Sequence, residues 1–375
     1  MMMKQALKQC NLNLQMSKTP KSKPLPSQLG FGTIFSDHML EANWTAKTGW
    51  SKPVIKKYEP MSISPAASSL HYGFSAFEGM KAYLDSDKNI RLFRPEENMK
   101  RLQESANRVC LPDFDANEYL GCMKELLKVD RSWIPQDFGN SMYIRPTFIS
   151  TDPDLSVSIP SFCKLYTILS PVGAYYKDGF KDVSLYVSDK YVRAFDGGTG
   201  NHKIAGNYAP TLMAQKEAIS KGHQQVLWLN KGNISEVGTM NIFFLRHANY
   251  DLNRLGERKN KRYQLVTPRL DGTILPGITR DSIIEIVKNE TDDIEVIEMD
   301  YHIEEFVSDI EKNKIIEVFG TGTAAIVSPV GQIEYNNNTY EIKNKVGNIT
   351  TSLYNRLLNI QYGIESESYG WSQIV

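Results

Sequence analysis

Lys203 lies in a stretch whose composition could turn an amine into a nucleophile. It is the only charged residue of segment 197–211, which carries glycines at positions 197, 198, 200 and 206. An amine held in a dry, glycine-lined loop has its charged form disfavoured, so its pKa falls toward neutrality and it becomes nucleophilic. The alternative is a solvated lysine in a surface loop, which is the commoner state of this residue type.

A phosphate-binding P-loop is the other chemical hypothesis for this segment. That motif requires Gly directly before the lysine and Ser or Thr directly after it. His202 and Ile204 occupy these two positions in the chain. Because both positions fail, Schiff-base chemistry is favoured over nucleoside triphosphate chemistry.

Other residues supply groups that a lysine bonded to a cofactor would need. Glu236 sits between apolar neighbours, which makes it either a capped turn residue or a buried base with a cationic partner. Segment 274–280 is a predicted tight turn whose helix begins near Thr279, and this helix start offers amides and a hydroxyl to an anion. Segment 320–325, after a predicted strand, is a second loop of glycine and threonine. With Tyr208 close after the lysine, this set suits pyridoxal phosphate, which needs a lysine, an acid and phosphate donors.

Two arginines stand where they could meet an anion. Arg101 borders the apolar stripe of a helix predicted to begin at Pro95. It is either a solvated helix arginine or one that reaches into a cleft. Tyr143 and Arg145 share one face of a strand predicted over 141–149, and an arginine pointing inward from a strand needs a carboxylate or phosphate partner.

The elements that must position these residues divide the chain of 375 residues into two domains. We expect an extended, solvated tail over 1–30 and a small α/β domain over 31–175. A connection over 176–191 leads to a larger domain over 192–375, which carries the lysine loop.

Local signals place two further features. The lysine loop leads into a predicted helix that Asn207 caps, with Pro210 in its first turn and a stop at Lys221–Gly222. The turn-rich loop at 151–157 carries two apolar tips, Leu155 and Val157. Exposed apolar tips of this kind commonly mark a subunit contact.

Composition excludes several classes of function. Lys plus Arg and Asp plus Glu both number 43, so no basic excess points to nucleic acid or a membrane surface. The four cysteines lack metal-ligand spacing and resemble reduced thiols of a cytosolic protein, and the six histidines form no HExxH pair. Ser75 misses the G-x-S-x-G elbow of serine hydrolases because Phe77 replaces the last glycine. We therefore expect no metal, no nucleic acid and no membrane.

Taken together, these segments resemble a known family, the fold-type IV pyridoxal-phosphate enzymes, and within it the branched-chain-amino-acid aminotransferases. The likeness runs from about Phe31 to Gly363. It is carried by the motifs Phe74-x-x-Phe77-Glu-Gly-Met-Lys-Ala, Leu92-Phe-Arg-Pro95, Tyr143-x-Arg145-Pro, Pro171-Val-Gly-Ala-Tyr175, Gly206-Asn-Tyr208, Glu236-Val-Gly-Thr-Met-Asn241, Leu275-Pro-Gly277 and Phe319-Gly-x-Gly-Thr323-Ala324.

The resemblance implies a role for each matched residue. Lys203 is similar to the Schiff-base lysine that also moves a proton at the substrate Cα, Glu236 to the pyridinium partner and Tyr208 to the donor for the cofactor's phenolate oxygen. Phosphate contacts are implied for Arg101, Ile278, Thr279 and Thr323. Arg145 is similar to the residue that receives the distal carboxylate of glutamate. A substrate pocket is implied for Tyr72, Phe77, Tyr143, Tyr175, Thr239 and Ala324, with Leu155 and Val157 on a loop that closes over the neighbouring subunit's pocket.

The fold and activity that follow are expectations. The resemblance implies a two-domain α/β and α+β enzyme, similar to D-amino-acid aminotransferase in fold, which forms homodimers in the cytoplasm or in mitochondria. It would move the amino group of leucine, isoleucine or valine to 2-oxoglutarate by a ping-pong mechanism. A D-amino-acid aminotransferase, an aminodeoxychorismate lyase and a non-enzymatic metabolite-binding protein of the same fold are the alternatives. Some relatives carry Cys-x-x-Cys where this chain has Ala325 and Ser328, so a redox switch there cannot operate.

Overall fold

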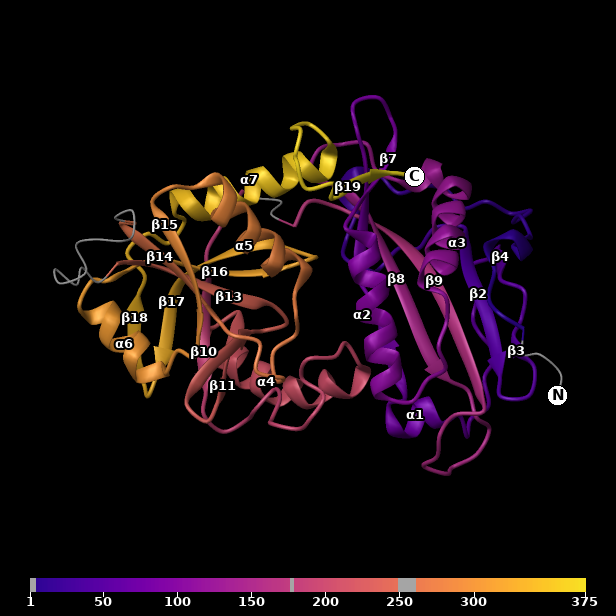
Figure 1. Ribbon diagram of the computed structural model, residues 1–375, viewed down its shortest axis with the longest axis horizontal. Helices are drawn as coiled ribbons and strands as arrows, with labels where there is room; N and C mark the ends of the chain where they lie inside the picture. Colours follow the sequence, from indigo (N-terminus) through magenta and orange to yellow (C-terminus); the bar gives the residue numbers. More distant parts are fainter. Residues whose placement is uncertain (1–4, 176–178, 249–260) are drawn as a thin grey trace. The chain divides into compact units, whose positions relative to one another are not determined.

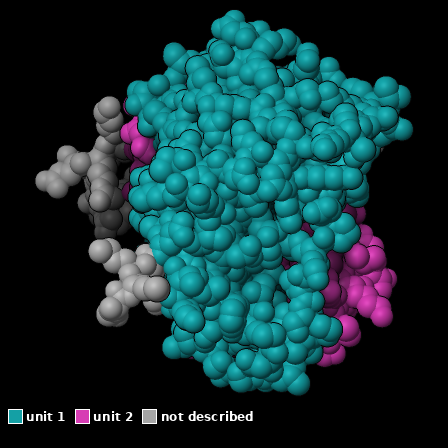
Figure 2. Space-filling model, turned by 90° about the vertical axis from the view of Figure 1, so that its right-hand side faces the viewer, with its two compact units in different colours: residues 1–177, 202–206, 358–375 teal, residues 178–201, 207–357 magenta. Residues whose placement is uncertain are grey.

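The computed structural model describes residues 5–175, 179–248 and 261–375, and Figure 1 labels the elements. The chain forms two compact units, coloured separately in Figure 2. Each unit has its own β-sheet. The first unit comprises Met1–Lys177, His202–Gly206 and Leu358–Val375, and the second comprises Asp178–Asn201 and Asn207–Leu357. Two units that mix strands and helices confirm the expected α/β and α+β class.

The first unit is built on a sheet of ten strands among the described residues, in the order β1-β4-β2-β9-β8-β6-β7-β19, with β3 beside β2 and β5 beside β8. The strands are β1 (Asn13–Leu14), β2 (His38–Thr45), β3 (Gly49–Trp50), β4 (Val54–Lys57), β5 (Ser75–Phe77), β6 (Met80–Leu84), β7 (Ile90–Phe93), β8 (Ser141–Ser150), β9 (Phe162–Val172) and β19 (Ser372–Ile374). Most pairs are antiparallel, and β1 runs parallel to β4.

Helices cover one face of this sheet. They are α2 (Pro95–Arg108) and α3 (Ala116–Val129), while α1 (Ser68–Tyr72) is a short helix before β5. Helix α2 has Pro95 at its first position and two acidic residues in its first turn, and the Asp115 carboxylate caps α3. Buried residues of both helices belong to the same apolar core as Ile144 and Phe148 of β8. Because strand residues alternate between faces, Tyr143 and Arg145 project from the opposite face, as the sequence predicts.

The N-terminal segment differs from the expected solvated tail. Leu7 is only 1% exposed and belongs to the core of the first unit. The Gln9 amide donates to Glu118 Oε2 at 2.6 Å, and the Lys21 amide donates to Asp37 Oδ1 at 2.9 Å. The packing of this segment depends on a single leucine and on scattered backbone contacts. Such contacts leave no apolar periodicity in the sequence, so a lysine-rich segment does not reveal them.

The second unit is built on a sheet of nine strands among the described residues, in the order β12-β11-β10-β17-β16-β13-β14-β15, with β18 beside β17. Its strands are β10 (Val183–Ser188), β11 (Gln225–Asn230), β12 (Asn233–Val237), β13 (Asn241–His247), β14 (Tyr263–Pro268), β15 (Ile294–Met299), β16 (Ile315–Gly322), β17 (Ile326–Tyr335) and β18 (Asn338–Glu341). Its helices are α4 (Leu212–Ser220), α5 (Ile278–Glu290), α6 (Ile303–Glu311) and the first part of α7 (Asn348–Tyr362).

Both faces of this second sheet are covered. Phe244 of β13 packs against Phe306 of α6 with ring centroids 4.7 Å apart. Its neighbour Phe243 points to the other face and stacks on Phe319 at 5.3 Å. Helix α5 packs on β15 and β16, and Ala214 and other residues of α4 pack on β11. Near-continuous apolar strands are what a sheet buried on both faces requires.

The unit boundaries differ from the expected ranges in three places. Strand β10 lies inside the expected connection at 176–191 and pairs with β11 and β17 of the second sheet. The lysine segment His202–Gly206 groups with the first unit, although it falls inside the expected range of the larger domain. The C-terminal residues Leu358–Val375 also belong to the first unit, where β19 pairs with β7.

The start of the helix after the lysine segment needs correction. Helix α4 begins at Leu212 after a 3-10 turn that contains Pro210, and Asn207 does not cap it. The Asn207 side chain instead bonds Thr199, since Nδ2 donates to the Thr199 carbonyl at 2.7 Å. The predicted stop is confirmed, because Lys221 ends α4 and Gly222 takes a φ of 88°.

The second loop of glycine and threonine is shorter than the predicted 320–325. Strand β16 continues through Gly322 and so includes the first half of that range. The turn that follows comprises residues 323–325, before β17 begins at Ile326. Thr323 and Ala324 therefore lie at the end of a strand, where their backbone is held by the sheet on either side.

We expect Leu7→Ala to lower the free energy of unfolding by about 2–5 kcal/mol, because it removes a fully buried side chain from a packed core. Leu14→Ala is the matched control, since Leu14 is 51% exposed in the same segment. Urea unfolding of both variants measures the difference. Equal, small effects would mean that the N-terminal segment is solvated after all.

Candidate active site

The main chain of Lys203 is fixed on both sides by the first unit. Its amide donates to Ser105 Oγ on α2 at 2.8 Å, and its carbonyl accepts from the Phe77 amide at 3.0 Å. Ile204 adds an isolated bridge to Ala76 of β5. Ser105 is completely buried, so water does not compete for its hydroxyl. The lysine is therefore attached to the edge of β5 rather than held in a mobile surface loop.

Two cationic side chains share the ring of Phe77. The Lys203 Nζ atom lies 4.8 Å from the ring centroid, and the Arg145 guanidinium carbon lies 4.7 Å from it. Aromatic rings attract cations through their negative faces. Two like charges beside one apolar ring also repel each other, which makes this part of the first unit suited to an anionic ligand.

Arg145 contacts a phenol and has no carboxylate partner among the ion pairs of the described residues. Its Nη2 donates to the Tyr143 hydroxyl at 2.7 Å, and its buried Nε has no acceptor in the described part of the chain. The Tyr143 hydroxyl lies over Gly79, where a Cβ atom would stand 2.2 Å from it. The expected charged partner of this inward-pointing arginine therefore does not come from the residues described here.

Arg101 is buried and joined to a carboxylate, which answers the question left open by the sequence. It is 7% exposed, and its Nε and Nη2 lie 2.6 Å and 3.0 Å from the two carboxylate oxygens of Glu78. Asn98 Nδ2 donates to the same carboxylate at 2.7 Å. Burial disfavours the charged form of Glu78, but Arg101, Lys203 and Asn98 outweigh that effect and hold the pKa of the carboxyl below its usual value.

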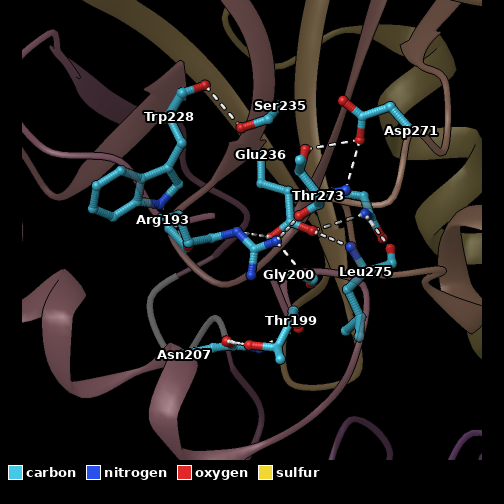
Figure 3. A network of polar contacts seen from close by, with 12 residues as sticks. Arg193, Thr199, Gly200, Asn207, Trp228, Ser235, Glu236, Asp271, Thr273 and Leu275 are labelled. Atoms are coloured by element: carbon cyan, nitrogen blue, oxygen red, sulfur yellow. Dashed lines mark hydrogen bonds and ion pairs between the residues drawn. The ribbon is translucent and has the colours of Figure 1, made fainter. Parts of the chain in front are cut away.

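In the second unit, Glu236 is the centre of a polar network (Figure 3). It is 3% exposed on β12, and Arg193 Nε lies 3.0 Å from its Oε2 atom. The Leu275 amide donates to Oε1 at 2.8 Å. Arg193 is held in turn by the carbonyls of Gly200, at 3.0 Å, and Thr273. Glu236 is thus a buried carboxylate with a cationic partner, and the arginine supplies the positive charge that its burial requires.

The same network shapes the start of α5. Asn241 Nδ2 donates to the Leu275 carbonyl at 2.9 Å. A Cβ atom at Gly277 would lie 1.9 Å from Asn241 Oδ1, so a larger residue there would displace the Asn241 side chain. Helix α5 then begins at Ile278, and no side chain of the described residues caps it. The buried Thr279 and the first amides of α5 therefore form the donor set that the sequence predicts for an anion.

The other predicted site residues fall into the two units as follows. In the first unit, the Tyr72 hydroxyl donates to the Leu155 carbonyl at 2.7 Å. Leu155, Val157 and Tyr175 are 62%, 74% and 49% exposed. In the second unit, Tyr208 lies between two 3-10 turns, Thr239 is exposed between β12 and β13, and Thr323 and Ala324 are half-buried after β16.

Several residues of these two clusters were missed by the sequence analysis. Glu78 lies inside a quoted motif but had no role, and Ser105 and Arg193 were not singled out. Ser105 follows Arg101 by four residues on α2, a spacing that puts both on one helix face. That periodicity could have identified Ser105. Arg193 carries no local signal, since its link to Glu236 spans 43 positions and depends on the sheet.

The described residues contain no group of three or more His, Cys, Asp or Glu side chains placed to hold a metal ion, and their four cysteines are free thiols. None of their helices is both long and apolar enough to cross a membrane.

Comparisons with known proteins agree on one family. Residues 75–333 match the model of the class IV aminotransferases. The cytosolic branched-chain-amino-acid aminotransferase of Rattus norvegicus is 46% identical over 353 residues, which cover 92% of this chain and 83% of that protein. Branched-chain-amino-acid aminotransferase 2 of Bacillus subtilis is 43% identical, with 96% of each chain covered. The solved structure of the branched-chain amino acid aminotransferase from Escherichia coli superposes with a TM-score of 0.67 at 26% identity, covering 89% of this chain and 98% of that one.

Proposed function

This chain belongs to the class IV aminotransferase family, and we propose that within it the chain is a branched-chain-amino-acid aminotransferase. It moves the amino group of leucine, isoleucine or valine to 2-oxoglutarate and yields branched-chain 2-oxo acids and glutamate. The observation that carries the proposal is the Phe77 ring, which the Lys203 amine and the Arg145 guanidinium share. A reactive amine, an apolar surface and a carboxylate-binding fork are the three things that this pair of substrates demands.

The residues present fit pyridoxal 5'-phosphate. A primary amine with a fixed main chain, a buried carboxylate with its own arginine and an uncapped helix start match the aldehyde, the ring nitrogen and the phosphate. When bound, the cofactor supplies an aldehyde for an amine and a ring that accepts electrons from the substrate Cα. Lys203 would hold the aldehyde, Glu236 the ring nitrogen and Tyr208 the phenolate oxygen. The phosphate would be held by Arg101, Ile278, Thr279 and Thr323.

Lys203 also serves as the base and acid at the substrate Cα. Its fixed backbone limits the arc that the amine can travel, which keeps it near the reacting carbon through both half-reactions. Burial of Glu236 beside Arg193 keeps an ionised carboxylate away from water. Such preorganised charges act more strongly in a water-excluded site than in solution.

One pocket serves two unlike side chains in the ping-pong cycle. Phe77, Tyr72 and Tyr175 offer aromatic surface to leucine, isoleucine and valine. The family resemblance adds Thr239 to the substrate pocket and assigns the Ala324 backbone amide to the substrate's α-carboxylate. A distal carboxylate would enter such a surface at a cost of several kcal/mol unless it met a partner. Arg145 is that partner, because its buried Nε has no acceptor in the described residues and its planar fork suits a carboxylate.

The chain works as a homodimer in the cytoplasm. Support for the dimer comes from exposed apolar side chains on the loop at 151–161, where Leu155, Val157 and Ile159 are 62%, 74% and 74% exposed. Support for the cytoplasm comes from four free thiols in the described residues and from the rat relative's name. Light scattering measures the first property, and microscopy of a fluorescent fusion measures the second.

We expect Lys203→Ala to abolish turnover of leucine and 2-oxoglutarate, because no other amine replaces the one on β5's edge. The matched control is Lys231→Ala, since Lys231 pairs with Asp196 on the surface and is 74% exposed at its side chain. A coupled assay for glutamate measures both variants. Substantial activity in Lys203→Ala without added amines would refute the assignment.

We expect Arg145→Met to weaken glutamate and 2-oxoglutarate by roughly 2–4 kcal/mol, the scale of a lost buried charge pair. The leucine half-reaction should suffer much less, because leucine brings no second carboxylate. Single-turnover kinetics of each half-reaction measure the split, with Arg91→Met as a control for loss of a structural arginine. Equal losses for both substrates would instead assign Arg145 to the shared α-carboxylate or to the fold.

A further inference from the structure

One face of α2 carries three polar side chains that contact the lysine segment or Glu78. Asn98, Arg101 and Ser105 follow one another at spacings of three and four residues, so they share a face. They are 4%, 7% and 0% exposed. Ser105 binds the Lys203 amide, whereas Asn98 and Arg101 both bind Glu78.

Glu78 joins these contacts into one cluster. Its side chain is fully buried, and its Oε2 atom accepts from Arg101 Nη2 at 3.0 Å, Asn98 Nδ2 at 2.7 Å and the Gly79 amide at 3.0 Å. Its Oε1 atom accepts from Arg101 Nε at 2.6 Å. Two parallel contacts between a carboxylate and a guanidinium fix both planes as well as the distance between them. The direction of the Arg101 guanidinium is thus set by Glu78.

Two nearby cations favour the charged form of Glu78. Burial raises the pKa of its carboxyl, but Arg101 and Lys203 lower that pKa and outweigh the burial. Arg145, at the Phe77 ring, adds a third cation to this part of the first unit. One carboxylate therefore offsets part of this charge and leaves the cluster positive enough for anionic ligands.

We propose that Glu78 is a positioning residue for the aminotransferase reaction. It aims Arg101 at the phosphate of the cofactor and holds the lysine segment and α2 in one cluster, whose positive charge it partly offsets. A buried ion pair stabilises a fold little compared with well-packed apolar residues of the same volume. Its usefulness here lies in fixing the direction of a charge. The inference rests on the proposed function, because it assigns the purpose of Arg101 from the cofactor.

The test compares pyridoxal 5'-phosphate with pyridoxal, which lacks the phosphate. Dissociation constants of both are measured by equilibrium dialysis for the wild-type apoprotein and for Glu78→Gln. The amide keeps the size of the side chain and removes its charge. We expect the dissociation constant for pyridoxal 5'-phosphate to rise about 10- to 100-fold, the scale of losing an outer-shell partner. The dissociation constant for pyridoxal should change little. The ratio of the two constants, which measures the preference for the phosphate, should therefore fall by the same factor.

Two further variants separate positioning from general damage. Arg101→Gln should also lose the preference for pyridoxal 5'-phosphate over pyridoxal. The double variant, Glu78→Gln with Arg101→Gln, should lose little more, because both substitutions remove the same interaction with the phosphate. Asp85→Asn is the control, since it breaks another ion pair of the first unit, the partly buried contact of Asp85 Oδ2 with Arg91 Nε at 2.8 Å. It should leave both dissociation constants unchanged. Glu78→Asp retains the charge but moves the carboxylate away from the Arg101 guanidinium, so it should give an intermediate loss of affinity for pyridoxal 5'-phosphate. This variant also keeps the test possible if Glu78→Gln does not fold.

The outcomes distinguish this inference from the proposed function. A wild-type protein that binds neither ligand would contradict the proposed function itself. A wild type that prefers the phosphate, with Glu78→Gln keeping that preference, would overturn the positioning role alone. Equal losses for both ligands, or additive losses in the double variant, would show that Glu78 only supports the fold.

Discussion

Attachment of the Lys203 main chain to the first sheet is the constraint on which the site depends. Its amide and carbonyl are both consumed, by Ser105 of α2 and by Phe77 of β5. Residues on both sides of the segment 202–206 belong to the second unit, yet the segment itself groups with the first. The Lys203 main chain is therefore fixed by the same strand and helix that carry Phe77 and Arg101.

Two buried arginine–carboxylate pairs lie among the candidate site residues. Arg101 pairs with Glu78 in the first unit, and Arg193 pairs with Glu236 in the second. Each carboxylate is nearly or fully buried, and each accepts at least one further hydrogen bond from a backbone amide. Charges held in this way cost no reorganisation when a charged ligand arrives. The Arg145 guanidinium differs, because it contacts the phenol of Tyr143 and the ring of Phe77, and its Nε lacks an acceptor among the described residues.

The sequence predicted the parts of the fold that depend on local signals. Helix α2 could be placed from Pro95 and its apolar stripe, and the shared face of Tyr143 and Arg145 follows from strand alternation. The resemblance to a family identified the chemistry, and the comparisons agree with it. The packing of Leu7 and the contact between Arg193 and Glu236 could not be predicted from the sequence. Both depend on contacts between segments far apart in the sequence, for which a single chain without an alignment carries no signal.

The central claim is that Lys203 and its surroundings pass an amino group from a branched-chain L-amino acid to 2-oxoglutarate through pyridoxal 5'-phosphate. The most direct measurement is the absorbance spectrum of the cofactor-loaded protein during two successive additions. L-Leucine should convert the band of the lysine-bound cofactor to that of its amine form, and 2-oxoglutarate should restore the first band. A spectrum that ignores L-leucine, or that responds to D-alanine instead, would contradict the account.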